Sequence, residues 1–481
     1  MIRQNRHLIE IMYTASQPSI FWHDYETFGA NPAKDRPAQF AGIRTDLDLN
    51  IISEPETFYC KQSTDYLPSP EAILITGITP QLANLKGLPE TEFMGRIHAL
   101  FSQPNTCVAG YNSLRFDDEV TRYGFYRNFI DPYAREWQNG NTRWDIIDLV
   151  RACYAFRPDG IHWPLKEDGS PSFKLEHLTQ ANGLSHEKAH DAMSDVYATI
   201  AMAKLIKEKQ PKLYQYYFEL RRKQAVGAQI DVLNMQPLAH VSSKISALQG
   251  CTTLIAPVAH HPSNKNAIIC VNLAMDLSPL FELDVEQIKT RMYTPRAELA
   301  ADELPIPVKQ VHLNKCPFIT SAKILDDAQA ERLNIDKAFA REQYKRLKAH
   351  PELREKLAQL FEHEGEVTTT DPDLMLYSGG FFSPADKAKM EIIRHTLPQN
   401  LAALDLQFDD GRIPEMLFRY RARNYPELLN DQEAQRWRSF CQQRLSDQDY
   451  LLKLENLLQD TEGDEHKQKL LAALCHYLRG I

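Results

Sequence analysis

Apolar and polar positions alternate in short runs over the first part of the chain. Residues 20–25, 39–45 and 56–61 have strand-like patterns separated by polar turns, which predicts an antiparallel meander. Residues 106–111 form another short apolar run, and residues 192–208 repeat apolar side chains at nearly helical spacing. Because helices are interleaved with the later strands, we expect an α/β domain with a mixed sheet.

The pattern changes beyond Gln210-Pro211, where the proline ends the helical repeat. Strand-like runs at residues 252–258, 267–273 and 308–313 are broken by proline and asparagine, and they predict a small β-rich domain. The last part of the chain is mostly helical. We therefore expect a leader (1–18), an α/β domain (19–209), a β-rich domain with a helical extension (210–362) and a helical C-terminal domain (363–481).

Composition narrows the class of protein and its compartment. Hydrophobic residues make up 43% of the 481 residues and charged residues 25%, which is typical of a globular protein. A net charge of −9 argues against a surface coated with basic residues, so a nucleic-acid site is expected to be a local groove or channel. The eight cysteines have no Cys-x-x-Cys spacing, and no apolar run approaches 18 residues. We expect a cytoplasmic protein with reduced thiols, no signal peptide and no membrane contact.

Asp24 and Glu26 are the first candidate site residues. They lie two positions apart in a predicted strand, so both carboxylates project from the same face. Two neighbouring carboxylates repel each other unless a cation lies between them, and Mg²⁺ or Mn²⁺ is the usual partner. The same spacing recurs at residues 117/119, 284/286 and 431/433, so by itself it favours a solvated face.

Two further acidic positions are candidates for the same site. Asp117 follows a buried strand and would lie near a helix N-terminus, where a carboxylate is favoured; a plain helix cap is the alternative, and Asp118 competes for the role. His190 and Asp195 are five residues apart and would not share a helix face, so His190 is expected in the preceding loop. An overlapping pair, His186 and Asp191, is less favoured because Asp195 lies within the apolar helix.

These positions together resemble a known constellation. Asp24, Glu26, Asp117 and Asp195, with His190, occur in the order of the DEDD exonucleases, in their histidine branch. Several longer segments resemble the bacterial exodeoxyribonuclease I family over nearly the full chain: 21–29, 74–80, 110–122, 190–200 and 418–424. A tyrosine-branch enzyme would need Tyr at position 191, which is Asp. The resemblance implies an RNase H-like exonuclease domain, an SH3-like middle domain and a helical C-terminal domain.

The resemblance also implies an activity. It predicts a Mg²⁺-dependent 3′→5′ exonuclease that degrades single-stranded DNA to nucleoside 5′-monophosphates during DNA repair or recombination, with two Mg²⁺ ions and Mn²⁺ as a substitute. Asp24, Glu26 and Asp195 would hold one ion, and Asp24 and Asp117 would hold the other. His190 would take the proton from the attacking water, a role that suits a side chain with a pKa near 6.5.

Basic and aromatic residues alternate between positions 122 and 151, and such interleaving is typical of single-strand binding by stacking and phosphate pairing. A core-facing aromatic stripe with a charged outer face is the alternative. The expected substrate contacts are Arg122, Tyr133, Trp137, Arg151, Lys174 and Glu26. A second mixed cluster, at 419–425, would either line a channel or form a helix surface.

The family resemblance further implies a partner, the acidic C-terminal tail of single-stranded-DNA-binding protein. Candidate basic residues for that contact are Arg157, Lys212 and residues 221–223. The chain is expected to be a monomer. Two other functions stay open on the sequence: a 3′→5′ exoribonuclease of the same superfamily, and a non-catalytic single-strand-binding module that kept the fold.

Overall fold

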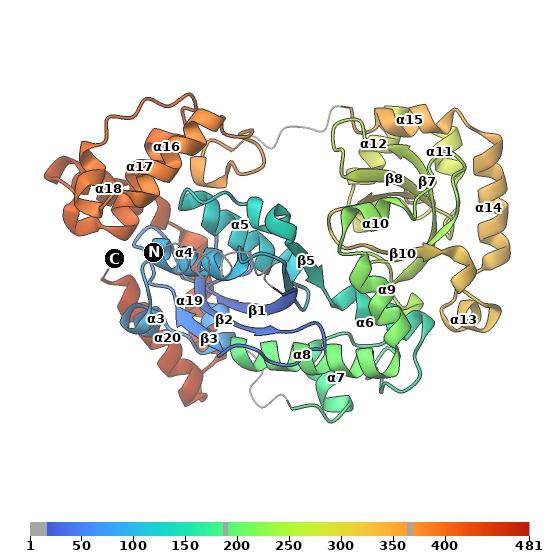
Figure 1. Ribbon diagram of the computed structural model, residues 1–481, viewed down its shortest axis with the longest axis horizontal. Helices are drawn as coiled ribbons and strands as arrows, with labels where there is room; N and C mark the ends of the chain where they lie inside the picture. The colour runs from blue at the N-terminus through green and yellow to red at the C-terminus, as the bar shows by residue number, and fades with distance from the viewer. Residues whose placement is uncertain (1–16, 186–190, 363–368, 481) are drawn as a thin grey trace, which may run out of the picture. The chain divides into compact units, whose positions relative to one another are not determined.

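The computed structural model describes residues 17–185, 191–362 and 369–480. Among these residues the chain divides into two compact units. The first contains the described residues within 1–142, 187–197 and 367–481, and the second those within 143–186 and 198–366. Four strands of one five-stranded sheet lie in the first unit, and the other five-stranded sheet lies in the second (Figure 1).

The first sheet has the order β3-β2-β1-β4-β5. Strand β1 lies at its centre, antiparallel to β2 and parallel to β4, so the predicted mixed sheet and antiparallel meander are confirmed. The strands are β1 (Ser19–Thr27), β2 (Pro37–Thr45), β3 (Glu56–Tyr59), β4 (Thr106–Gly110) and β5 (Thr142–Asp145).

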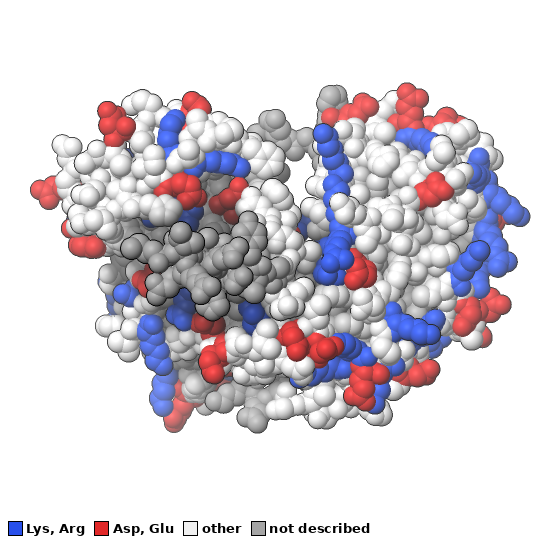
Figure 2. Space-filling model, viewed as in Figure 1, with Lys and Arg blue, Asp and Glu red and all other residues white. Residues whose placement is uncertain are grey.

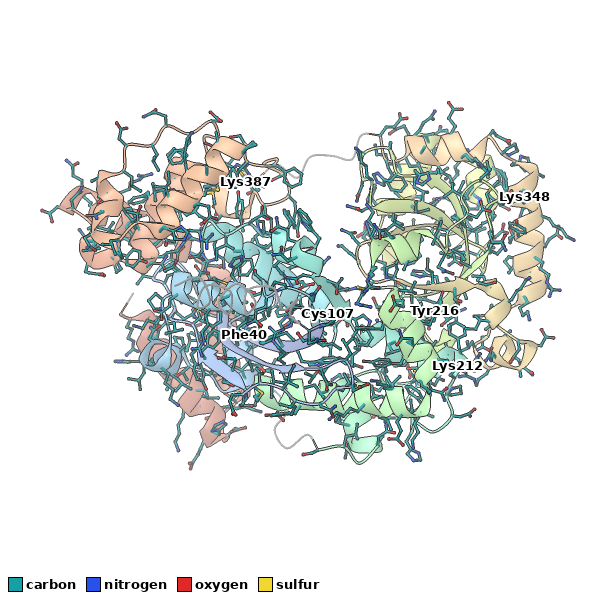
Figure 3. The ribbon with its side chains drawn as sticks, viewed as in Figure 1. Phe40, Cys107, Lys212, Tyr216, Lys348 and Lys387 are labelled. Atoms are coloured by element: carbon teal, nitrogen blue, oxygen red, sulfur yellow. The ribbon has the colours of Figure 1, made fainter. Side chains whose placement is uncertain are left out.

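One face of this sheet is covered by an aromatic core. Phe21 and Tyr25, on the same face of β1, pack with Phe40 of β2 and with Phe93 and Phe101 of α4 (Glu90–Phe101). Alternation along β1 therefore directs the apolar side chains to this core and leaves Asp24 and Glu26 on the opposite face. Phe40 marks the middle of this sheet in Figure 3.

Helices of the N-terminal part begin at residues suited to helix starts. Pro70 and Pro80 occupy first helical positions after the side-chain caps Ser69 and Thr79. The α-helices are α2 (Pro70–Thr76), α3 (Pro80–Lys86), α4 (Glu90–Phe101) and α5 (Asp117–Arg127). Short 3₁₀ turns are η1 (Ser113–Arg115), η2 (Ala134–Glu136) and η3 (Gln138–Gly140).

The C-terminal part of the chain is helical, as predicted. Its helices are α16 (Pro384–His395), α17 (Ile413–Asn424), α18 (Asp431–Leu445), α19 (Gln448–Asp460) and α20 (Glu465–Leu478), with η7 (Pro372–Leu374), η8 (Pro398–Ala403) and η9 (Pro426–Leu428). Leu454 of α19 and Leu471 of α20 share a buried cluster with Ile73 and Ala83. The last two helices thus complete a core of the N-terminal part.

The second unit contains the β-rich domain. Its sheet has the order β10-β6-β7-β8-β9 with antiparallel neighbours, and the runs predicted at 252–258, 267–273 and 308–313 become β7, β8 and β9. The strands are β6 (Leu238–Val241), β7 (Thr252–His260), β8 (Ala267–Asn272), β9 (Val308–His312) and β10 (Phe318–Ser321).

Helices of the second unit precede, interrupt and follow this sheet. They are α6 (Ile147–Phe156), α7 (Leu175–Ala181), α9 (Pro211–Glu219), α10 (Lys223–Gly227), α11 (Ser278–Glu282), α12 (Val285–Tyr293), α13 (Asp327–Arg332), α14 (Lys337–Ala349) and α15 (Leu353–Gln359), with η4 (Ala247–Gln249), η5 (Arg296–Glu298) and η6 (Ala322–Ile324). Helix α8 (Ala192–Lys209) begins in the first unit and continues into the second.

The distribution of surface charge and the state of the cysteines are consistent with the amino-acid composition. Acidic and basic side chains are interspersed on the face shown in Figure 2. All eight cysteines are free, and seven of them are buried. Among the described residues, no helix combines the length and apolar character needed to cross a membrane.

Candidate active site

Three carboxylates from two elements form the centre of the candidate site. Asp24 and Glu26 project from β1, and Asp195 projects from the first turn of α8. One oxygen atom from each of the three residues lies within 4.8 Å of the others. Because β1 is paired on both sides, its two carboxylates are held by a rigid element.

Asp191 has a different role from Asp195, although both are acidic and lie one helical turn apart. The Asp191 side chain accepts a hydrogen bond from the backbone N–H of Ser194 at 3.2 Å, and its carbonyl oxygen accepts from the N–H of Asp195. Asp191 therefore caps the start of α8. The next turn carries Asp195 to the β1 carboxylates.

Asp117 begins α5 and lies close to the three-carboxylate cluster without being part of it. Its Oδ1 accepts a hydrogen bond from the backbone N–H of Tyr25 at 3.2 Å. Strand β4 ends at Gly110 and pairs with β1 only as far as Trp22, so the Tyr25 N–H is available to this carboxylate. Asp117 is thereby attached to the strand that carries Asp24.

Asp118, the competing carboxylate, is held by a different partner. Its Oδ1 accepts a hydrogen bond from Nη2 of Arg135 at 2.5 Å, and both side chains are buried. The Tyr25 hydroxyl and Thr121 Oγ1 form a second link between β1 and α5, at 2.9 Å. These contacts fix the rotation of α5 against β1, so they determine which of the two neighbouring aspartates approaches Asp24.

Burial and mutual repulsion perturb the acids of the cluster. Burial, followed by the charges of Asp195 and Asp117, raises the pKa of Glu26 from 4.5 to about 8. Burial and the charges of Asp117, Glu26 and Asp195 raise the pKa of Asp24 well above its usual value. A divalent cation would relieve this repulsion, and carboxylate oxygens are the donors that Mg²⁺ and Mn²⁺ prefer. The residues present therefore fit a metal ion.

His190 lies outside the described residues. The expected substrate contacts lie in both units, with Arg122, Tyr133 and Trp137 in the first and Arg151 and Lys174 in the second.

The Arg122 side chain is buried, and its guanidinium already has hydrogen-bond partners within the protein. Its Nε and Nη2 donate to the two carboxylate oxygens of Glu136 at 2.8 and 2.9 Å, and its Nη1 donates to Glu119 and to the hydroxyl of Tyr377. A DNA phosphate would have to compete with Glu136 for this guanidinium edge. The guanidinium also lies 5.4 Å from the ring centroid of Tyr133.

Trp137 differs from Arg122 because its side chain is 67% exposed and open to stacking. In the second unit, Arg151 is mostly buried and pairs with Asp148 at 2.7 Å. Lys174 is exposed there, with Nζ 3.3 Å from Glu176.

The structure adds aromatic residues that the sequence analysis missed. Phe381 is 85% exposed and meets the Tyr133 ring edge-on at 6.0 Å, beside a pocket of about 280 Å³. Tyr377 contacts Arg122 from the same C-terminal segment. Lys387, labelled in Figure 3, lines the pocket from α16. The sequence signal was a cluster of aromatic residues around Gly379 and Gly380 in an otherwise helical region.

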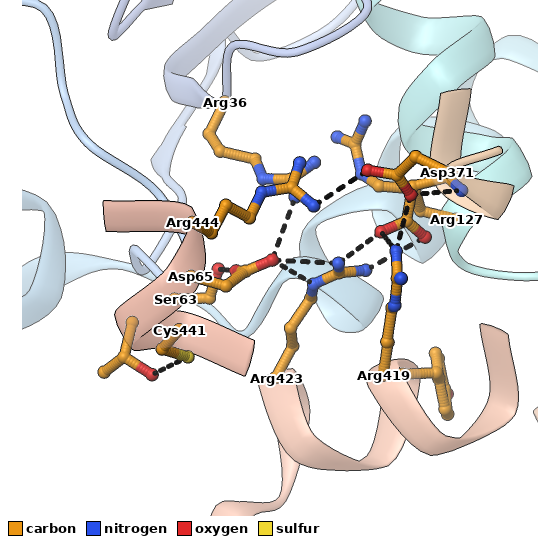
Figure 4. A network of polar contacts seen from close by, with 12 residues as sticks. Arg36, Ser63, Asp65, Arg127, Asp371, Arg419, Arg423, Cys441 and Arg444 are labelled. Atoms are coloured by element: carbon orange, nitrogen blue, oxygen red, sulfur yellow. Dashed lines mark hydrogen bonds and ion pairs between the residues drawn. The ribbon is translucent and has the colours of Figure 1, made fainter. Parts of the chain in front are cut away.

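The mixed cluster at 419–425 does not form an exposed helix face, because each of its residues is buried or partly buried. Arg419 and Arg423 are buried and pair with Asp371, Asp373 and Asp65 (Figure 4). A buried guanidinium needs such partners. The cluster therefore joins α17 to the loop after β3.

Basic residues considered for a partner contact are in the second unit and are exposed or partly exposed. Lys212 is exposed in the first turn of α9 and is labelled in Figure 3. Arg222 pairs with Glu219, Lys223 donates to Asn266, and Arg221 lies over the ring of Phe218. The Arg157 guanidinium donates to the carbonyl of Phe156.

Family models match all three parts of the chain. A model described as "Exonuclease" matches residues 21–203, "Exonuclease I SH3-like domain" matches 221–363, and "Exonuclease I C-terminal domain" matches 370–481. The chain is 52% identical to exodeoxyribonuclease I of Escherichia coli K12 over 97% of its own length and 98% of the relative. It is 50% identical to exodeoxyribonuclease I of Haemophilus influenzae, over 95% of its own length and 98% of that relative.

Solved structures give the same correspondence. The crystal structure of E. coli exonuclease I with a dA16 oligonucleotide matches with a TM-score of 0.94 at 52% identity, covering 96% of this chain and 100% of that one. The zinc-bound complex of E. coli exonuclease I with single-stranded DNA matches with a TM-score of 0.93 at 51% identity. The match covers 96% of this chain and 99% of that one. A crystal structure of SSB/exonuclease I with the inhibitor CFAM matches with a TM-score of 0.91 at 50% identity. The match covers 97% of this chain and 100% of that one.

Proposed function

Because this chain belongs to the exodeoxyribonuclease I family and is an exonuclease, we propose that it degrades single-stranded DNA from the 3′ end in a Mg²⁺-dependent reaction. The products would be nucleoside 5′-monophosphates. The reaction would serve DNA repair or recombination. The observation that carries this proposal is the convergence of Asp24, Glu26 and Asp195 within 4.8 Å. The relative with bound dA16 supports the choice of substrate.

The carboxylates would act together as the metal site. Asp24, Glu26 and Asp195 would hold one Mg²⁺ and Asp24 with Asp117 the other, and Mn²⁺ would substitute. Two such ions activate the attacking water and stabilise the leaving oxygen of a phosphodiester. The zinc-bound relative supports the binding of a divalent ion.

Other residues would handle the proton and the strand. His190 would accept the proton from the attacking water, a task suited to an imidazole. Glu26 would also contact the terminal nucleotide. Tyr133 and Trp137 would stack on bases, while Arg122, Arg151 and Lys174 would pair with phosphates.

The domains and the partner complete the proposal. An exonuclease domain (19–209), an SH3-like domain with its helical extension (210–362) and a C-terminal domain (363–481) would work as one cytoplasmic monomer. The SSB/exonuclease I structure supports binding to the tail of single-stranded-DNA-binding protein. Arg157, Lys212 and residues 221–223 are the basic candidates on the second unit.

Digestion of oligonucleotides labelled at one end tests the function. A 5′-labelled DNA strand should shorten stepwise in Mg²⁺ and stay intact in EDTA, whereas a 3′-labelled strand should release labelled mononucleotide at once. Asp24→Asn should lose at least about a thousandfold in turnover while still binding the strand. Glu54→Gln, an exposed acid of the same unit, should behave as the wild type.

Each result also separates the two rival functions. Faster digestion of an RNA strand than of DNA of the same sequence would indicate an exoribonuclease. Binding of both strands without cleavage, in Mg²⁺ and in Mn²⁺, would contradict the proposal and indicate a single-strand-binding module.

A further inference from the structure

A polar cavity of about 410 Å³ lies in the first unit among residues that the proposed reaction does not use. Cavities that hold small molecules measure about 300–1,000 Å³. The lining residues are Arg36, Cys60, Lys61, Gln62, Ser63, Asn84, Pro89, Glu90, Arg423, Asn424, Pro426 and Glu427. They come from the loops before β2 and after β3, from α3, from the start of α4, from the end of α17 and from η9.

Arg36 supplies an unsatisfied donor edge in this cavity. Its side chain is buried, at 4% exposure, and its Nε and Nη2 have no hydrogen-bond partner among the described residues. Nη2 lies 3.5 Å from Asp65, but that carboxylate already accepts two hydrogen bonds from Arg423, at 2.9 and 3.1 Å (Figure 4). Nε and Nη2 form the edge of a guanidinium that binds two oxygen atoms of one phosphate or carboxylate in parallel.

Gln62 supplies the complementary acceptor. Its Nε2 donates to the carbonyls of Pro37 and Cys60, both at 3.0 Å, which fixes the orientation of the amide. Its Oε1 is buried and has no partner within the described part of the chain. A buried acceptor of this kind favours a ligand that carries a hydroxyl or amino group as well as an anion.

The charges around the cavity favour a doubly negative group. Of the acids that line the cavity, Glu90 pairs with Arg127 at 2.7 Å and Glu427 is exposed, while Arg423 pairs with Asp65 and Asp373. Lys61 is exposed at the rim, where it forms no ion pair with another described residue. Lys61 and Arg36, which shares Asp65 with Arg423, are thus the cations with capacity for a new anion, and a phosphate monoester carries about two charges at neutral pH.

We propose that this cavity binds a phosphate monoester of mononucleotide size. The phosphate lies on the Nε/Nη2 edge of Arg36 with Lys61 beside it, and a sugar hydroxyl or base amino group donates to Gln62 Oε1. The nucleoside 5′-monophosphates that the nuclease would release belong to this class of ligand. Their identification as the ligand rests on the proposed function. The site needs no metal ion, which separates it from the carboxylate cluster.

Calorimetric titration of the full-length protein with 5′-dAMP in EDTA tests the proposal. Binding at one site is expected, and Asp24→Asn should leave it unchanged. Inorganic phosphate should compete, whereas deoxyadenosine without phosphate should not. Because the measurement uses neither metal nor turnover, it is independent of whether the protein is a nuclease.

Two variants assign the binding to this cavity. Arg36→Lys keeps the charge but loses the parallel donor edge, and should weaken 5′-dAMP binding about tenfold or more. Lys61→Met changes an exposed side chain that the fold does not need, and should weaken binding about two- to fivefold. Lys34→Met, another exposed lysine of the same unit, is the control and should have no effect.

Absence of 5′-dAMP binding in EDTA would overturn the proposal. Binding of equal strength in the Lys61→Met, Lys34→Met and wild-type proteins would overturn it as well, even if the Arg36→Lys variant failed to fold.

Discussion

Replacing Glu26 by glutamine should stabilise the metal-free protein and remove much of its stabilisation by Mg²⁺. Burial, together with the charges of Asp195 and Asp117, raises the pKa of Glu26 from 4.5 to about 8. The ionised carboxylate is therefore held in a place that disfavours it, and a neutral amide of similar shape removes that penalty.

The magnitude follows from the two pKa values. The difference between 4.5 and about 8 corresponds to roughly 5 kcal/mol at about 1.4 kcal/mol per pH unit, which is the upper limit of the gain. Burying the glutamine amide costs part of it, so we expect a gain of about 2 kcal/mol at pH 8. For a cooperative unit of this size, that gain raises the melting temperature by roughly 4–8 °C.

The sign depends on pH. Glu26 has a higher pKa in the folded protein than in the unfolded chain, so its contribution to stability is fully present below about pH 4.5 and is lost as the pH rises to about 8. The variant should therefore gain little over the wild type at pH 5 and most at pH 8. Saturating Mg²⁺ at pH 8 should stabilise the wild type more than the variant.

Thermal melting of both proteins in EDTA at several pH values, and again in Mg²⁺, measures these differences. Glu54→Gln, at an exposed position, should show no pH-dependent gain. The reasoning is refuted if Glu26→Gln is less stable than the wild type at pH 8 in EDTA, or if its gain is the same at pH 5 and pH 8.

Other predictions concern the buried ion pairs, the proton acceptor and the strand contacts. Arg423→Leu should lower the free energy of unfolding by about 3–5 kcal/mol in a denaturant titration, because Asp65 and Asp373 would stay buried without the cation they share, Asp65 keeping only Arg36 at 3.5 Å and Asp373 only Arg419; Arg438→Leu, on an exposed face, should have little effect. Burial alone would raise the pKa of Asp65, but the charges of Arg423 and Arg36 hold it well below its usual value. Stability should therefore fall as the pH drops below about 4, and a flat melting temperature from pH 5 to pH 3 would contradict this assignment. His190→Ala should lower turnover while leaving Mg²⁺ affinity unchanged in calorimetry, and an unaffected rate would remove His190 from its role. Trp137→Ala should weaken binding of a dT oligonucleotide by about 1–3 kcal/mol in fluorescence anisotropy, and an unchanged affinity would exclude stacking on this side chain.

Local patterns in the sequence were sufficient for much of the fold and for the acidic centre. The meander of β1 to β3, the strand at β4 and the long helix α8 appear where their periodicity predicts them. Alternation along β1 places Asp24 and Glu26 on one face, and the apolar context of Asp195 distinguishes it from Asp191. These features could be predicted because strand and helix periods are properties of neighbouring residues.

Contacts between distant segments were decided only by the tertiary structure. The sequence predicts Arg122 as a phosphate contact, and only the fold shows that its guanidinium also donates to Glu136 and Tyr377, with which a phosphate would have to compete. Arg419 and Arg423 read as a surface or channel cluster, yet folding buries them against acids far away in the chain. The partner of a charged side chain depends on which elements pack together, and a pattern of neighbouring residues carries no record of that packing.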